Sequence, residues 1–117
     1  MTYELSLAPA ARADIIDTLD WSVKNFGDLV REGYEALIVA AFDLIRDDPT
    51  VLGSRERADL AVGLRTLHLR ACRNHVSPAV RRISSPRHFV VYRKVGEVVQ
   101  VVRLLHDAMN LPEQHFD

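Results

Sequence analysis

The sequence predicts an α+β fold in which an N-terminal strand and an antiparallel helical hairpin precede a three-stranded antiparallel sheet and a short C-terminal tail. Residues 2–7 alternate apolar and polar side chains, and residues 9–47 carry two helical repeats separated by Gly27. Residues 87–106 form two β-branched runs joined at Gly96, as in a hairpin. Two helices packed on one face of a mostly antiparallel sheet form an α+β sandwich.

The N-terminal half contains the first strand and both helices. Pro9 suits the first position of a helix over residues 9–25, and Gly27 suits the position just after it. A second amphipathic repeat predicts a helix over residues 29–47 that ends before Pro49. Because the connection is so short, the two helices must run antiparallel.

The C-terminal half contains the rest of the sheet. Residues 50–63 read as a loop, and the alternation in residues 63–70 predicts a strand. Residues 71–86 hold two prolines and three arginines without a period, which indicates an exposed loop. The hairpin of residues 87–106 follows, and residues 107–117 form a polar tail.

Composition predicts a single domain over residues 1–117. Apolar residues make up 48% and charged residues 26%, as in ordinary globular proteins. The chain has no apolar run of about 20 residues, so we expect no contact with a membrane. The single cysteine and the absence of a signal-peptide pattern favour the cytoplasm.

The charges are unevenly distributed. Residues 1–59 contain twelve acidic residues and six Lys or Arg, whereas residues 60–96 contain eight Lys or Arg and no acid. Either the two halves pair within the chain, or a positive face binds an acidic partner such as nucleic acid or an acidic protein segment. The residues expected to bind such a partner are Arg65, Arg70, Arg73, Arg81, Arg82, Arg87, Arg93, Lys94, Arg103 and His106.

General acid–base cleavage of RNA is the enzymatic interpretation that the sequence allows. It requires an acid, a base and cations near the scissile phosphate, which Arg93, Arg103 and His106 would supply. We expect Phe89 and Val91 to pack against the helices, so the alternation distributes the candidate groups over both faces of the sheet. The pattern therefore favours a protein that is not an enzyme.

Other catalytic centres have less support. His68, Cys72 and His75 have the spacing of ligands on one helix face, but a strand running into a loop would point them in different directions. The chain contains no Gly-x-Ser-x-Gly motif and no Gly-rich phosphate loop. We therefore expect no metal ion, no cofactor and no nucleophilic centre.

Three stretches carry the motifs of one family. Residues 7–15 read LAPAARADI, residues 88–93 read HFVVYR and residues 101–111 read VVRLLHDAMNL. They resemble, in order, the LSPAAxxDL opening, the HxxFYR strand and the IVRVLHxxMDL closing motif of ParE toxins, in the RelE/ParE superfamily of type II toxin–antitoxin systems. The resemblance runs nearly end to end. Residues 71–86 depart from the family pattern, because this stretch is longer than the usual turn.

The resemblance implies a toxin that a ParD-like ribbon-helix-helix antitoxin neutralises in a hetero-oligomer, with operator DNA bound only through the antitoxin. ParE toxins are taken to poison DNA gyrase, which blocks replication and growth and stabilises a plasmid or genome. The cations named above would then bind the antitoxin or the target. Two alternatives stay open: a ribosome-dependent mRNA endoribonuclease of the RelE type, and a nucleic-acid-binding module.

Overall fold

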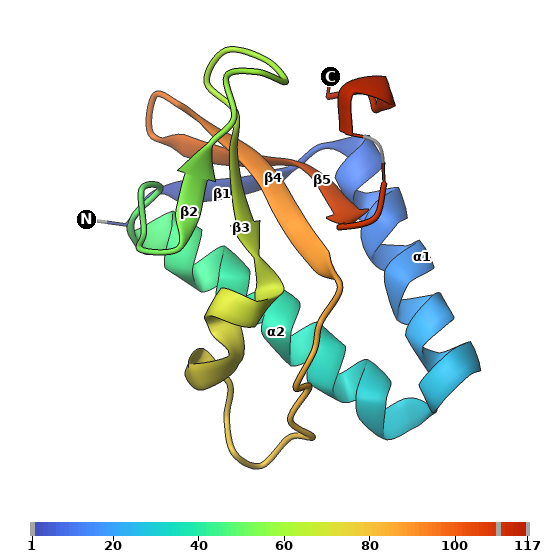
Figure 1. The fold of residues 1–117 in the computed structure, drawn as a ribbon. Helices are drawn as coiled ribbons and strands as arrows, with labels where there is room; N and C mark the ends of the chain where they lie inside the picture. Colours follow the sequence, from blue (N-terminus) through green and yellow to red (C-terminus); the bar gives the residue numbers. More distant parts are fainter. Residues whose placement is uncertain (1, 110, 117) are drawn as a thin grey trace.

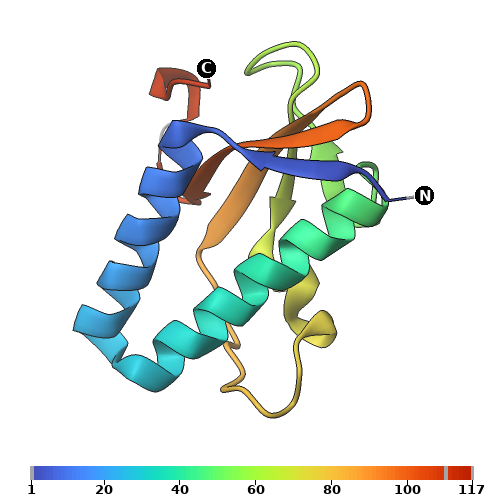
Figure 2. The same ribbon diagram turned by 180° about the vertical axis from the view of Figure 1, so that it is seen from behind.

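Two helices lie against one face of a five-stranded sheet (Figure 1). The computed structural model describes residues 2–109 and 111–116, with the elements β1 (Glu4–Leu7), α1 (Pro9–Phe26), α2 (Asp28–Asp47), β2 (Ser54–Glu56), β3 (Arg65–His68), the 3₁₀ helix η1 (Leu69–His75), β4 (His88–Val95), β5 (Val98–His106) and the 3₁₀ turn η2 (Leu111–Glu113). The strand order is β1-β5-β4-β3-β2, with β1 parallel to β5 and the other neighbours antiparallel. The α2 helix passes behind the strands in Figure 1 and in front of them in Figure 2. The predicted fold class is confirmed, although the sheet is larger than predicted and mixed.

The helix ends follow from the residues found there. Pro9 is the first residue of α1, and Ala8 before it makes no side-chain capping hydrogen bond. Gly27 has a φ of 87°, a left-handed conformation that favours glycine, so it ends α1 and turns the chain directly into α2. Within the described residues, no helix is long and apolar enough to span a membrane.

Two stretches predicted as loops contain regular structure. Residues 50–63 contribute the edge strand β2, which pairs with β3 and is too short for periodicity to reveal. The stretch 71–86 was predicted to be exposed, yet its first residues belong to η1, where the Cys72 side chain is fully buried. The 3₁₀ helix therefore packs as part of the fold, and only the residues after it form a surface loop.

The sheet has a hydrophobic core on each face. Val90 and Tyr92 of β4 join the helix-side core with residues such as Leu37 of α2, whereas Phe89 and Val91 belong to the core on the far face. The expectation that Phe89 and Val91 pack against the helices is therefore wrong. Because both faces of β4 are buried, its alternation does not identify the helix side.

The C-terminal tail covers the far core. Its predicted polar stretch contains the η2 turn, and Leu111 and Phe116 pack against the far-face cluster. Asn110 and Asp117 lie outside the described residues. The tail thus contributes to the fold on the sheet face that the helices leave open.

Gly33 lets the long loop pack against the middle of α2. A Cβ atom at this position would overlap the carbonyl oxygen of Arg81 and lie 2.9 Å from Cδ1 of Ile83. Gly33→Ala is expected to destabilise the protein by about 1 kcal/mol, because overpacking costs about 1–3 kcal/mol and exceeds the helix-propensity gain of about 1 kcal/mol. Thermal unfolding measures this change, and amide exchange should accelerate in residues 77–83. Glu35→Ala, an exposed change on the same helix, is the control. A Gly33→Ala protein more stable than wild type would contradict this packing.

Candidate functional site

A groove lined by arginines runs from the sheet face opposite the helices onto η1 and the loop before β4. Two adjoining cavities of about 530 and 260 Å³ form it, and Arg70 and Asp107 line both. We call these two cavities the basic groove. Its arginines come from β2 and the segment after it, from η1 and from the residue before β4: Arg55, Arg57, Arg70, Arg73 and Arg87.

Asp107 holds the centre of the basic groove together. Its carboxylate accepts hydrogen bonds from Nε2 of His68 at 3.0 Å and from Nε of Arg87 at 3.1 Å. Partial burial opposes ionisation, but these two hydrogen bonds outweigh it and hold the pKa of Asp107 below its usual value. Nδ1 of His68 accepts a hydrogen bond from the N–H of Arg70 at 3.1 Å, so the neutral ring carries its proton on Nε2. Burial lowers the pKa of His68, although the hydrogen bond to Asp107 opposes this.

A cluster of rings lies on the helix side of the same end of the sheet. The Tyr34 hydroxyl accepts a hydrogen bond from the N–H of Arg87 and shares a second with Nδ1 of His88, each at 2.9 Å. The rings of Trp21 and His106 meet the His88 ring edge-on, with centroids 5.8 and 5.1 Å away. Burial, with the nearby charge of His106, lowers the pKa of His88 to about 4. His88 is therefore a neutral packing residue near pH 7.

Arg103 connects β5 to α1. Its Nε and Nη2 donate to the two carboxylate oxygens of Asp14 at 2.6 and 3.0 Å, and the N–H of Leu104 donates to the same carboxylate at 3.0 Å. The third guanidinium nitrogen donates to the carbonyl oxygen of His115. The hydrogen bond to Asp14 raises the pKa of Arg103. The guanidinium is therefore fully engaged in holding the fold together.

The ten residues predicted to bind a partner do not form one surface. Arg70, Arg73 and Arg87 line the basic groove. The other seven lie elsewhere: Arg65 bonds to Ser54, Arg93 to Gln100 and Arg103 to Asp14, Lys94 lies over the Tyr3 ring, His106 meets His88, and Arg81 and Arg82 line a pocket beside α2.

Arg55 and Arg57 also line the basic groove, although the sequence did not predict them as binding residues. Both lie in residues 50–63, which were predicted to form a loop, so no face could be assigned to them. Residues two apart in an extended chain point to the same face. Recognising β2 would therefore have predicted that these two arginines join one side of the sheet edge.

The three residues that would form a nuclease centre do not converge. Arg93 pairs across the hairpin with Gln100, whereas His106 pairs with His88 at the other end. Five residues separate these positions along β4, or about 16 Å. Arg103 is held by Asp14. The arrangement therefore offers no shared acid–base site among these three groups.

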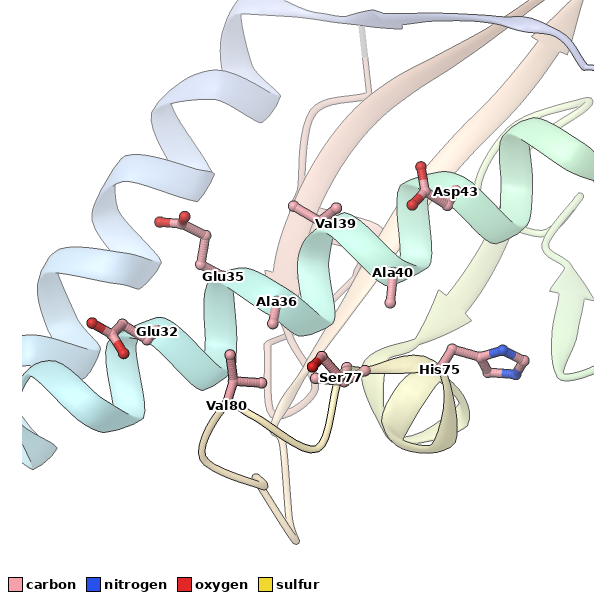
Figure 3. A pocket seen from close by; sticks show the side chains of 10 residues that line it. Glu32, Glu35, Ala36, Val39, Ala40, Asp43, His75, Ser77 and Val80 are labelled. Carbon is pink, nitrogen blue, oxygen red and sulfur yellow. The ribbon is translucent and has the colours of Figure 1, made fainter.

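A second groove, between α2 and the loop after η1, has the opposite character (Figure 3). Its volume is about 420 Å³, and α2 presents the carboxylates of Glu32, Glu35 and Asp43 around it. Val39 and Val80 supply apolar surface. An acidic rim does not suit the anionic partner that the basic residues predict, so the basic groove is the better candidate site.

Known proteins provide an independent comparison. The family model described as the ParE toxin of the type II toxin–antitoxin system, parDE, matches residues 5–111. A solved structure described as the chromosomal ParDE TA system from P. aeruginosa aligns with a TM-score of 0.63 and 19% sequence identity, covering 90% of this chain and 96% of that chain. No curated protein matches the chain. The family match covers most of the chain and agrees with the motifs and the fold, and the chain belongs to the ParE toxin family of type II toxin–antitoxin systems.

Proposed function

We propose that this type II toxin inhibits DNA gyrase in the cytoplasm, thereby blocking replication and growth, and that a ParD-like ribbon-helix-helix antitoxin neutralises it. The family match over residues 5–111 carries the proposal. The separation of Arg93 from His106 supports inhibition by binding rather than RNA cleavage, because general acid–base catalysis needs its groups around one phosphate.

The basic groove is the surface that we propose for contact with the target. No carboxylate in residues 2–109 and 111–116 forms an ion pair with Arg55, Arg70 or Arg73. An acidic antitoxin segment that folds on binding would be steered to these charges. By covering the groove in a hetero-oligomer, such a segment would prevent contact with the target.

The purified toxin should stop gyrase from supercoiling relaxed plasmid. Prior mixing of the toxin with the cognate antitoxin should restore supercoiling. Induction in a bacterium should cause filamentation and a DNA-damage response while mRNA stays intact. His106→Ala should remain inhibitory, since its ring packs on His88 outside the groove. Rapid loss of translation with cleaved mRNA and no DNA damage would contradict the proposal.

A further inference from the structure

We propose that the basic groove binds the phosphate backbone of duplex DNA. This inference rests on the proposed function for its biological setting, since gyrase acts on DNA. The binding itself is a property of the chain alone. Operator recognition would remain with the antitoxin, because contacts to phosphates carry no sequence information.

The charge balance of the groove favours an anion. Five arginines line it, and Asp107 is the carboxylate among the lining residues. Asp107 already accepts hydrogen bonds from Arg87 and His68, so its charge is neutralised within the protein. Arg57 is likewise paired with Asp59 at 2.8 Å. The charges of the remaining three arginines are available to successive phosphates.

The groove is built before any ligand arrives. Arg55 is anchored through the pairing of β2 with β3. Arg73 donates to the carbonyl oxygens of Arg70 and Ser84, which fixes the loop before β4 against η1. The exposed hydroxyls of Ser84 and Ser85 lie at this end and can donate to phosphate oxygens. Arginine and hydroxyl donors are the groups that typically contact a phosphate backbone.

The lining also indicates which kind of nucleic acid fits. Single strands are bound by aromatic rings on which bases stack. Two aromatic rings line this groove: Phe89 is 7% exposed and packed into the far core, and the His68 side chain is 15% exposed, with both ring nitrogens hydrogen-bonded within the protein. No base could therefore stack on an open ring here. A groove that supplies cations without a stacking platform suits the regular backbone of a duplex.

The test measures the affinity of the full chain for a fluorescently labelled DNA duplex of about two helical turns. Fluorescence anisotropy reports the binding, and the titration is repeated over a range of salt concentrations. Wild type should bind with a salt dependence equivalent to about three phosphate contacts. The double variant Arg55→Ala/Arg70→Ala should bind about tenfold more weakly and reduce the salt slope by about 2. Neither side chain makes a hydrogen bond or ion pair among the described residues, so folding should be unaffected.

Two further variants isolate the site. Arg12→Ala/Arg81→Ala removes the same charge from exposed positions outside the groove and should change the affinity by less than about threefold. Arg55→Lys/Arg70→Lys keeps both charges and should retain most of the salt slope. Equal losses in the two alanine pairs, absence of duplex binding by wild type, or tighter binding of the matching single strand would each overturn the inference.

A parallel supercoiling assay separates this inference from the proposed function. Inhibition of gyrase by a chain that does not bind duplex DNA would overturn the inference and leave the proposed function standing. Duplex binding that depends on Arg55 and Arg70 in a chain with no effect on gyrase would support the inference and overturn the proposed target.

Discussion

Replacing Arg103 by alanine is expected to lower the free energy of unfolding by about 2–4 kcal/mol. The guanidinium and its partner Asp14 are only 16% and 15% exposed, and together they connect β5 to α1. Removing Arg103 leaves a largely buried carboxylate with the N–H of Leu104 as its remaining donor in this network. Breaking a buried pair in this way costs far more than losing a surface ion pair. Chemical denaturation of purified protein measures the loss.

Companion variants decide whether the effect is structural. Asp14→Ala should be destabilising to a similar degree, and the double variant should cost clearly less than the sum of the two single changes. Arg31→Ala removes an exposed ion pair with Glu35 at 3.4 Å and should cost less than about 0.5 kcal/mol. Toxicity should fall in proportion to stability across this series. An Arg103→Ala protein of full stability that had lost toxicity would instead assign Arg103 to the target contact.

The role of Arg103 could not be predicted from its motif. Arg103 lies near His106 in the closing motif of residues 101–111, whereas its partner Asp14 lies on α1, far away along the chain. Local signals were more reliable. Pro9 and Gly27 define the limits of α1 because each acts through its own backbone geometry.

The contact between the rings of His88 and His106 could not be predicted from the sequence either. The turn at Gly96 sets a register that, continued along the hairpin, would place His88 opposite Leu105. A β-bulge shifts the register by one residue and brings His106 opposite His88. An extra residue within a run of β-branched side chains leaves the composition and alternation almost unchanged, so only the folded pairing reveals it.

The uneven distribution of charge along the sequence predicts a positive face, but it does not predict the basic groove or its lining residues. Counting charges in residues 60–96 indicates a positive face but does not distinguish an exposed arginine from an engaged one. Arg70 is exposed in the groove, whereas Arg65 is partly buried and donates to Ser54. Which arginines converge depends on the pairing of β2 with β3, and β2 has too few residues for a periodic signal.

Acid is expected to destabilise the protein through His88 by about 3 kcal/mol. Burial, with the charge of nearby His106, lowers the pKa of His88 from 6.5 to about 4. Above the higher value the imidazole is neutral in both the folded and the unfolded chain, so it does not affect stability. Between the two values the unfolded chain binds a proton that the folded chain does not, and stability falls with decreasing pH. Below the lower value the loss is complete.

His88→Gln tests this expectation, because it keeps an acceptor near the Tyr34 hydroxyl but cannot titrate. Denaturant unfolding near neutral pH and near the folded pKa should show that the variant loses about 3 kcal/mol less on acidification than wild type. His68→Gln should retain most of the wild-type pH dependence, since His68 is less buried than His88. The lowered pKa of Asp107 adds its own loss only at more acidic pH. An unchanged pH dependence in His88→Gln would mean that the ring cluster opens to water in acid and accepts the proton without unfolding.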